Sequence, residues 1–168
     1  IAGITNGIDP ADFDTTDRHN TGIAGSYDIR NSSDDLAGKR RCKEEMLENL
    51  ADVPKSGDEQ RSGYLQLEPG WPLFTFIGRL SDQKGVDILA DAVDLFLSDG
   101  KEANVLCLGS GVDHQEETLR KVATEPGNSG RFCFIRGYDP LLANRIYAAG
   151  DFFLIPSRYE PCGLTDYI

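Results

Sequence analysis

The amino-acid sequence predicts an α/β protein with a Rossmann-like, doubly wound parallel sheet. From Trp71 onward, short apolar runs alternate with helical segments across short loops, and this order is typical of right-handed crossovers between parallel strands. The apolar runs are too short for buried helices and are followed by Gly or turn residues, as buried parallel strands are. The expected strands are 73–78, 104–111, 131–137 and 151–157, and the expected helices are 86–97, 114–124 and 140–150.

The first strand and helix illustrate the pattern. The run LFTFIG at 73–78 is apolar and aromatic and ends in Gly. In 86–97 the apolar residues recur with a helical period, and Gly100 closes the segment.

The part of the chain before Trp71 is different in character. Residues 1–36 are rich in Asp, Thr, Asn, Gly and Ser, which favours a long surface excursion with turns over packed structure. A helix is expected over 38–50 and a polar loop over 52–63, whereas YLQLE at 64–68 is compatible with a strand or an irregular lead-in.

Composition and charge exclude several classes of function. The 168 residues are 39% hydrophobic and carry 17 Lys plus Arg against 28 Asp plus Glu, a formal net charge of −11. Such a chain repels nucleic acid and anionic lipid, so we expect neither as a partner. No apolar run approaches the length of a membrane span, and the first residues lack the features of a signal peptide. A bound phosphate would have to be met by a few placed cations.

Cysteine and histidine spacing gives no sign of a metal site. The four cysteines form no CxxC pair, and neither His has ligand-like partners at helical spacing; these residues are Cys42, Cys107, Cys133, Cys162, His19 and His114. We therefore expect no metal and a reducing compartment.

In a doubly wound sheet, ligands bind beyond the carboxyl ends of the strands. The candidate residues are those that follow each expected strand: 78–80, 109–111, 137–139 and 156–161. In GRLSDQKG, Arg79 and Lys84 flank a strand-to-helix turn and could hold a diphosphate. The alternative is that Arg79 pairs with an acidic residue and Lys84 is a solvated flank.

The next two loops give weaker signals. GSG at 109–111 lacks the third Gly of a dinucleotide fingerprint, so a tight turn or close backbone approach is favoured over a nicotinamide site. Tyr138 could stack on a nucleobase, although a half-buried loop tyrosine is the commoner case.

The last loop, PSRYEPCGLT at 156–165, carries a carboxylate at a strand end. Glu160 could act in catalysis, bind sugar hydroxyls or cap a helix, and the amides after Gly163 could receive a phosphate oxygen. Cys162 as a thiol nucleophile is disfavoured because no His lies near it in the sequence.

The sequence also resembles a known family. NGID at 6–9, GRLSDQKGVDIL at 78–89, GYD at 137–139 and LANRIYAAGDFFLIPSRYEPCGLT at 142–165 are similar in order and spacing to bacterial glycogen synthases and plant starch synthases. These are retaining glycosyltransferases of the GT-B fold, and the chain resembles an incomplete C-terminal half. The resemblance implies an interdomain crossover with a variable surface loop at 1–37 and a partial Rossmann-like nucleotide-sugar-binding domain at 38–168. The KxGGL motif of the N-terminal domain does not occur in the sequence.

The resemblance implies a role for each motif residue. Arg79 and Lys84 would grip the donor diphosphate and neutralise the leaving group, Tyr138 would stack on adenine, and Glu160 would be the essential acid near the glucose. Catalytic roles are thus expected for Glu160, Arg79 and Lys84. The further substrate-binding residues would be Cys162, Gly163, Leu164, Thr165 and Asn6, the last lining the cleft near the hinge.

The implied function is transfer of glucose from ADP-glucose or UDP-glucose to the non-reducing end of an α-1,4-glucan, with retention. No cofactor or metal is expected, the fragment alone is expected to be inactive without the N-terminal domain, and the location is expected to be cytoplasmic, or plastid in a plant. The alternatives are another GT-B nucleotide-sugar transferase and a non-catalytic nucleotide-binding module. Asn144 stands where the family usually has His, and Ile168 stands where related families have a second Glu.

Overall fold

The computed structural model describes residues 7–52 and 60–167, which contain a five-stranded sheet with the order β1-β4-β3-β2-β5. β2 pairs in parallel with β3 and β5, and β3 pairs in parallel with β4. The predicted α/β doubly wound fold is confirmed. The strands are β1 (Arg61–Leu65), β2 (Leu73–Ile77), β3 (Asn104–Gly109), β4 (Arg131–Arg136) and β5 (Phe152–Phe153).

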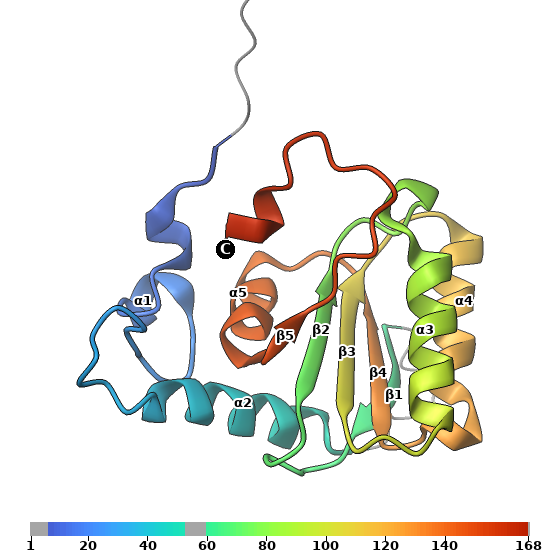
Figure 1. The fold of residues 1–168 in the computed structure, drawn as a ribbon, viewed down its shortest axis with the longest axis horizontal. Helices are drawn as coiled ribbons and strands as arrows, with labels where there is room; N and C mark the ends of the chain where they lie inside the picture. Colours follow the sequence, from blue (N-terminus) through green and yellow to red (C-terminus); the bar gives the residue numbers. More distant parts are fainter. Residues whose placement is uncertain (1–6, 53–59, 168) are drawn as a thin grey trace, which may run out of the picture.

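Helices cover both faces of the sheet (Figure 1). α3 and α4 lie on one face, and α2 and α5 lie on the other. The helices are α1 (Arg18–Thr21), α2 (Ala37–Leu50), α3 (Val86–Ser98), α4 (Asp113–Thr124) and α5 (Pro140–Ala149), with short 3-10 turns η1 (Pro10–Phe13), η2 (Asp82–Lys84), η3 (Pro126–Asn128) and η4 (Leu164–Tyr167). None of the helices in the described ranges is both long and apolar enough to cross a bilayer.

The alternation of side chains along the central strands produces two cores. In β3, Val105 and Cys107 pack in the cluster with α3 and α4, whereas Leu106 and Leu108 pack in the cluster with α2 and α5. Successive residues of a strand point to opposite faces, so a strand buried on both faces must be apolar throughout. All six residues of β3 are buried, and the one polar residue among them, Asn104, donates from Nδ2 to the Gln66 carbonyl at 3.2 Å.

The edge strand β1 departs from the predicted all-parallel sheet. It is antiparallel to β4, and it takes in Arg61–Leu65, so the loop predicted over 52–63 ends earlier than expected. Because β1 runs opposite to β2, the connection through residues 66–72 needs no crossover helix, which a parallel pair would require. The undecided segment 64–68 therefore contributes only its first two residues to the sheet.

The other edge strand, β5, is shorter than the predicted 151–157. Only Phe152 and Phe153 pair with β2, and the amides of Asp151 and Leu154 add one bond each, to the carbonyls of Leu73 and Thr75 at 2.8 Å. Pro156 lacks the amide hydrogen that a longer ladder would need. The chain beyond β5 therefore leaves the sheet and passes over its end (Figure 1).

The prediction that residues 1–36 lack packed structure is wrong for part of this segment. Thr21, Ile23 and Tyr27 are buried, and the last two join the core between α2 and α5. The close approach is possible because Gly38 faces this segment: a Cβ at Gly38 would lie 1.9 Å from the Ser26 carbonyl oxygen. Amino-acid composition alone does not reveal this packing, because the two apolar side chains Ile23 and Tyr27 are enough to anchor the segment in the core.

Candidate active site

The loops that follow the strands meet at one edge of the sheet, as predicted. Leu80, after β2, forms a parallel bridge with Gly111, after β3, and the Gly137 amide, after β4, donates to the Gly109 carbonyl at 3.0 Å. β2 leads through α3 toward β3 and β4, whereas α5 returns the chain to β5 on the other side of β2. The strand order therefore reverses between β2 and β5, and such a switch point is where open α/β sheets bind ligands.

An ion pair between a cation and a carboxylate lies at this switch point. Lys84, the last residue of η2, places Nζ 2.5 Å from Glu160 Oε1, and Ser157 Oγ donates to the same oxygen at 2.5 Å. About a quarter of each charged side chain is exposed, 22% for Lys84 and 26% for Glu160. The hydrogen bond from Lys84, followed by that from Ser157, lowers the pKa of Glu160 below its ordinary value. The carboxylate is thus held ionised next to a cation.

Hydrogen bonds to backbone carbonyls hold the two loops of this pair together. The Arg158 amide donates to the Gln83 carbonyl at 2.9 Å, and Gln83 Nε2 donates to the Tyr159 carbonyl at 3.0 Å. Gly85 has φ +64°, and a Cβ there would lie 2.2 Å from the Pro156 carbonyl oxygen. Only glycine allows both the left-handed conformation and this close approach.

Arg79 is the second cation on the loop after β2. Its side chain is exposed, and Nη2 lies 3.4 Å from Gln83 Oε1. In the described part of the chain it makes no ion pair with a carboxylate. The alternative in which Arg79 pairs with an acidic residue is therefore not observed there, and its guanidinium keeps donors for an anion.

Tyr138 and Asp139 follow β4. The Tyr138 side chain is not half-buried: the residue is 85% exposed. Asp139 caps α5, since its carboxylate accepts hydrogen bonds from the amides of Leu141 and Leu142. The tyrosine ring is thus presented to solvent next to a fixed helix start, and its stacking on a base stays a prediction.

The residues after Glu160 turn into η4. Gly163 has φ +58° and precedes Leu164 and Thr165, the first residues of η4, while Cys162 is a partly exposed free thiol. Their contacts with substrate stay predictions. The predicted cleft residue Asn6 lies outside the described residues.

The GSG segment makes a close backbone approach, as favoured above. A Cβ at Gly109 would lie 2.2 Å from the Gly78 carbonyl oxygen, and one at Gly111 would lie 1.9 Å from that of Leu80. The buried carboxylate of Glu116 accepts the Gly111 amide at 3.0 Å and pairs with Arg136 at 2.6 Å. The glycines therefore bring two loops together.

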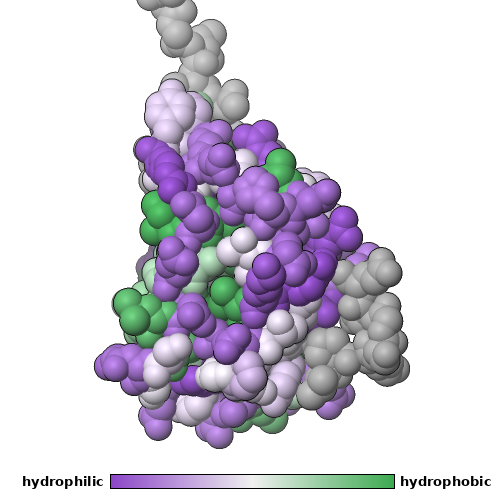
Figure 2. Space-filling model, turned by 90° about the vertical axis from the view of Figure 1, so that its right-hand side faces the viewer, coloured by the Kyte–Doolittle hydropathy of each residue, from purple (hydrophilic) through white to green (hydrophobic). Residues whose placement is uncertain are grey.

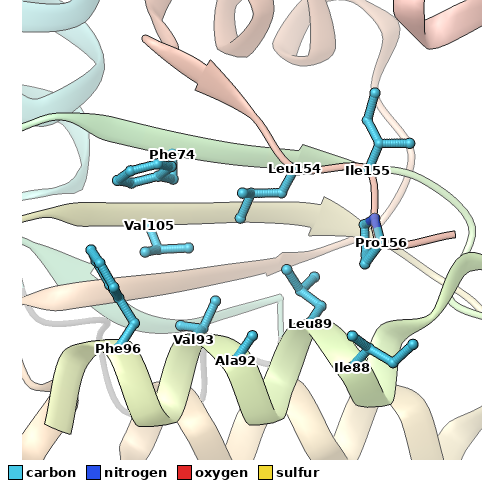
Figure 3. Close-up of a pocket in the computed structure, with 10 residues that line it drawn as sticks. All are labelled: Phe74, Ile88, Leu89, Ala92, Val93, Phe96, Val105, Leu154, Ile155 and Pro156. Carbon is cyan, nitrogen blue, oxygen red and sulfur yellow. The ribbon is translucent and has the colours of Figure 1, made fainter. Parts of the chain in front are cut away.

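A groove of about 330 Å³ lies between α3 and the β2–β5 edge (Figure 3). Aliphatic side chains, proline and two phenylalanines line it, and none of its lining side chains is titratable. It offers nothing to a diphosphate, so the charged site at the strand ends is the better candidate for chemistry. The outer face of α3 and α4 is mostly hydrophilic, with hydrophobic side chains gathered toward one side (Figure 2).

Within residues 7–52 and 60–167, no group of three His, Cys, Asp or Glu side chains could hold a metal ion. The expectation that no metal takes part stays a prediction. Asn144, which replaces the usual His, donates from Nδ2 to the Asp12 carbonyl at 3.1 Å and so links α5 to η1.

Sequence reasoning placed Ser157 and Arg158 in a candidate loop but gave neither a role. Ser157 shares the acceptor Glu160 Oε1 with Lys84. Arg158 contacts Asp82 and Asp87, which lie 76 and 71 residues before it in the chain. The opposite charges of Asp87, after β2, and Arg158, after β5, were the available signal, but only the fold shows that they meet.

The chain is similar to known glycosyl transferases. Residues 71–165, which hold most of the site, match the family of glycosyl transferases group 1. The chain is 37% identical over 166 residues to a glycogen synthase of Anaeromyxobacter sp. (strain Fw109-5) and 38% identical over 166 residues to soluble starch synthase 1 of Solanum tuberosum. These matches cover 98% of the chain but only 30% and 22% of the two relatives.

A solved structure is similar over the same extent. The catalytic domain of starch synthase IV from Arabidopsis thaliana, bound to ADP and acarbose, superposes with a TM-score of 0.74 at 28% identity, over 98% of this chain and 29% of that one. The resemblance seen in the motifs is thus confirmed over nearly the whole chain. The chain belongs to the family of glycosyl transferases group 1.

Proposed function

We propose that the protein containing this chain is a glycogen or starch synthase that transfers glucose from ADP-glucose, or from UDP-glucose, to the non-reducing end of an α-1,4-glucan with retention. The observation that carries the proposal is the meeting of Lys84, Glu160 and Ser157 at the switch point, with the exposed Arg79 on the same turn. The similarity to glycogen and starch synthases supports it.

The chemistry of these side chains fits a nucleotide-sugar donor. Two cations on one strand-to-helix turn can hold a diphosphate and neutralise the charge that develops on the leaving group, and such an arrangement contributes several kcal/mol in a transition state. Their charge makes a metal ion unnecessary for this purpose. Glu160, kept ionised, would bind the glucose or the developing charge at its anomeric carbon.

Nucleobase and distal-phosphate contacts complete the proposed half-site. The exposed ring of Tyr138 would stack on adenine, and the segment 162–165 would contact the sugar and phosphate. The chain spans less than a third of its relatives, so we propose that the acceptor surface and the KxGGL motif belong to a second domain and that the chain alone does not extend glucan. A cytoplasmic or plastid location is part of the same proposal.

Calorimetric titration of ADP, UDP and AMP into the 168-residue chain tests the half-site. We expect selective binding of ADP that is lost in Arg79→Ala and in Lys84→Ala but retained in Arg120→Ala, which removes an exposed cation on α4. Selective UDP binding would change the proposed donor. Absence of nucleotide binding by the folded chain, together with no transfer from either nucleotide sugar by the full-length protein, would overturn the proposal.

A further inference from the structure

Arg158 makes a bidentate contact across the switch point. Its Nη1 and Nη2 donate to the two carboxylate oxygens of Asp87 at 2.7 and 2.5 Å, and Nη1 also donates to the Asp82 carbonyl at 2.9 Å. Asp87 lies in the first turn of α3, and Asp82 begins η2. The guanidinium therefore joins the loop after β5 to both elements that follow β2, as the path of that loop beside the start of α3 also shows (Figure 1).

The geometry differs from that of an ordinary surface ion pair. Both side chains are about half exposed, 46% for Arg158 and 51% for Asp87, so the pair by itself adds little to stability. Its two parallel hydrogen bonds fix the orientation of the guanidinium, which a single contact does not. The hydrogen bond from Arg158 lowers the pKa of Asp87 to about 2. The carboxylate is thus ionised under any condition in which the protein would act.

The contact is directly connected to the charged site. The amide of the same Arg158 donates to the Gln83 carbonyl, and Gln83 precedes Lys84 in η2. Arg158 also lies between Ser157 and Glu160 in the sequence, and the Ser157 hydroxyl donates to Glu160 Oε1. Side chain and backbone of one residue therefore set the position of the Glu160 loop relative to the Lys84 turn.

We propose that Arg158 and Asp87 are positioning residues. Their ion pair clamps the loop at 156–161 onto the start of α3, so that Glu160 keeps its hydrogen bond from Lys84. This inference rests on the proposed function for its effect on catalysis. In this proposal the clamp acts through the loop and not by contact with the diphosphate or the sugar. A displacement of about 1 Å at a catalytic group can cost up to a hundredfold in rate.

The clamp can be tested without reference to catalysis. In the 168-residue chain labelled with ¹³C at glutamate carboxyls, the pKa of Glu160 is measured by NMR, with Glu160→Gln identifying the signal. We expect Arg158→Met to raise this pKa toward the ordinary value, because the hydrogen bonds from Lys84 and Ser157 to Glu160 would be formed for less of the time. Arg120→Met, which breaks an exposed Arg–Glu pair within α4, is the matched control and should leave it unchanged.

The effect on the reaction is measured in the full-length protein. We expect Arg158→Met and Asp87→Asn each to lower kcat for glucosyl transfer roughly tenfold, with the KM for the donor changed less than about threefold. Their double variant should lose little more than either single one, since both remove the same contact. Arg158→Lys, which keeps one donor but not the fork, should recover part of the activity.

The outcomes separate the two proposals. If the pKa of Glu160 and kcat are the same in Arg158→Met as in Arg120→Met, the clamp proposal is overturned. A kcat loss that matches only a loss of folded protein, seen by thermal unfolding, would also overturn it. If the full-length protein transfers no glucose at all, the proposed function fails. A raised pKa of Glu160 in both Arg158→Met and Asp87→Asn would still establish the clamp, because loss of the Asp87 charge alone would lower this pKa.

Discussion

At the scale of single residues, one carboxylate oxygen organises the site. Glu160 Oε1 accepts from both Lys84 and Ser157. The two loops that bring these groups together are separated by 76 residues between Lys84 and Glu160. The site therefore depends on the charge state of one group, and its stability must change with pH.

The pH dependence of Glu160 gives the first prediction. Because its pKa is lowered in the fold from 4.5, first by Lys84 and then by Ser157, its contribution is present above the unfolded pKa and is lost as pH falls through the folded pKa. We expect Glu160→Gln to destabilise the chain at pH 7 and to destabilise it less at about pH 3, because protonation of the native carboxyl increases as the pH falls below 4.5 toward its lowered pKa. Urea unfolding at both values measures this.

Ser157→Ala provides the companion variant. It removes one of the two donors and should cause a smaller loss in the same direction. A Glu160→Gln effect of equal size at both pH values would contradict the electrostatic account.

At the scale of elements, the turn between β2 and α3 decides the geometry of the site. Gly85 has φ +64° and faces the Pro156 carbonyl oxygen, at 2.2 Å from an added Cβ. The turn therefore brings Lys84 next to the loop after β5 only while residue 85 has no side chain.

A glycine pair tests this argument. Gly100, after α3, has φ +76° but nothing within 4 Å of an added Cβ, so Gly100→Ala should cost only the backbone strain of about 1 kcal/mol. Gly85→Ala carries the same strain and a backbone clash, and we expect it to cost about 2 kcal/mol more. It should also weaken nucleotide binding, while Gly100→Ala should not.

Urea denaturation of both variants gives the two free energies of unfolding. Equal losses would show that the contact with Pro156 does not restrain the turn, and the explanation of the loop geometry would then be wrong.

At the scale of the whole molecule, the N-terminal segment completes one of the two cores. Ile23 and Tyr27 pack in the cluster between α2 and α5, and burial of Tyr27 raises its pKa to about 12. This segment lies beside α5 and the N-terminal part of α2, on the side away from the strands (Figure 1).

Two isoleucines of this segment, one buried and one exposed, test whether the segment is part of the core. Ile23 is 4% exposed and Ile29 is 78% exposed. We expect Ile23→Ala to lower the free energy of unfolding by about 2–4 kcal/mol and Ile29→Ala to change it by less than about 0.5 kcal/mol. Chemical denaturation checks both, and a negligible effect of Ile23→Ala would mean that the segment is not part of the cooperative core.

The sequence by itself determined the strand–helix alternation from Trp71 onward, because buried strands and amphipathic helices leave periodic apolar patterns. It also placed Arg79, Lys84 and Glu160 at strand ends, since parallel strands share one carboxyl edge. The cap that Asp139 provides to α5 is also local, since its carboxylate accepts from the amides of Leu141 and Leu142.

Only the tertiary structure decided which of these residues meet. The direction of β1, the burial of Ile23, and the contacts of Glu160 with Lys84 and of Arg158 with Asp87 join segments far apart along the chain. Hydrophobic periodicity carries no information on which partner a charged loop side chain selects. That choice follows from the strand order and from glycine-permitted close approaches, which exist only once the sheet is assembled.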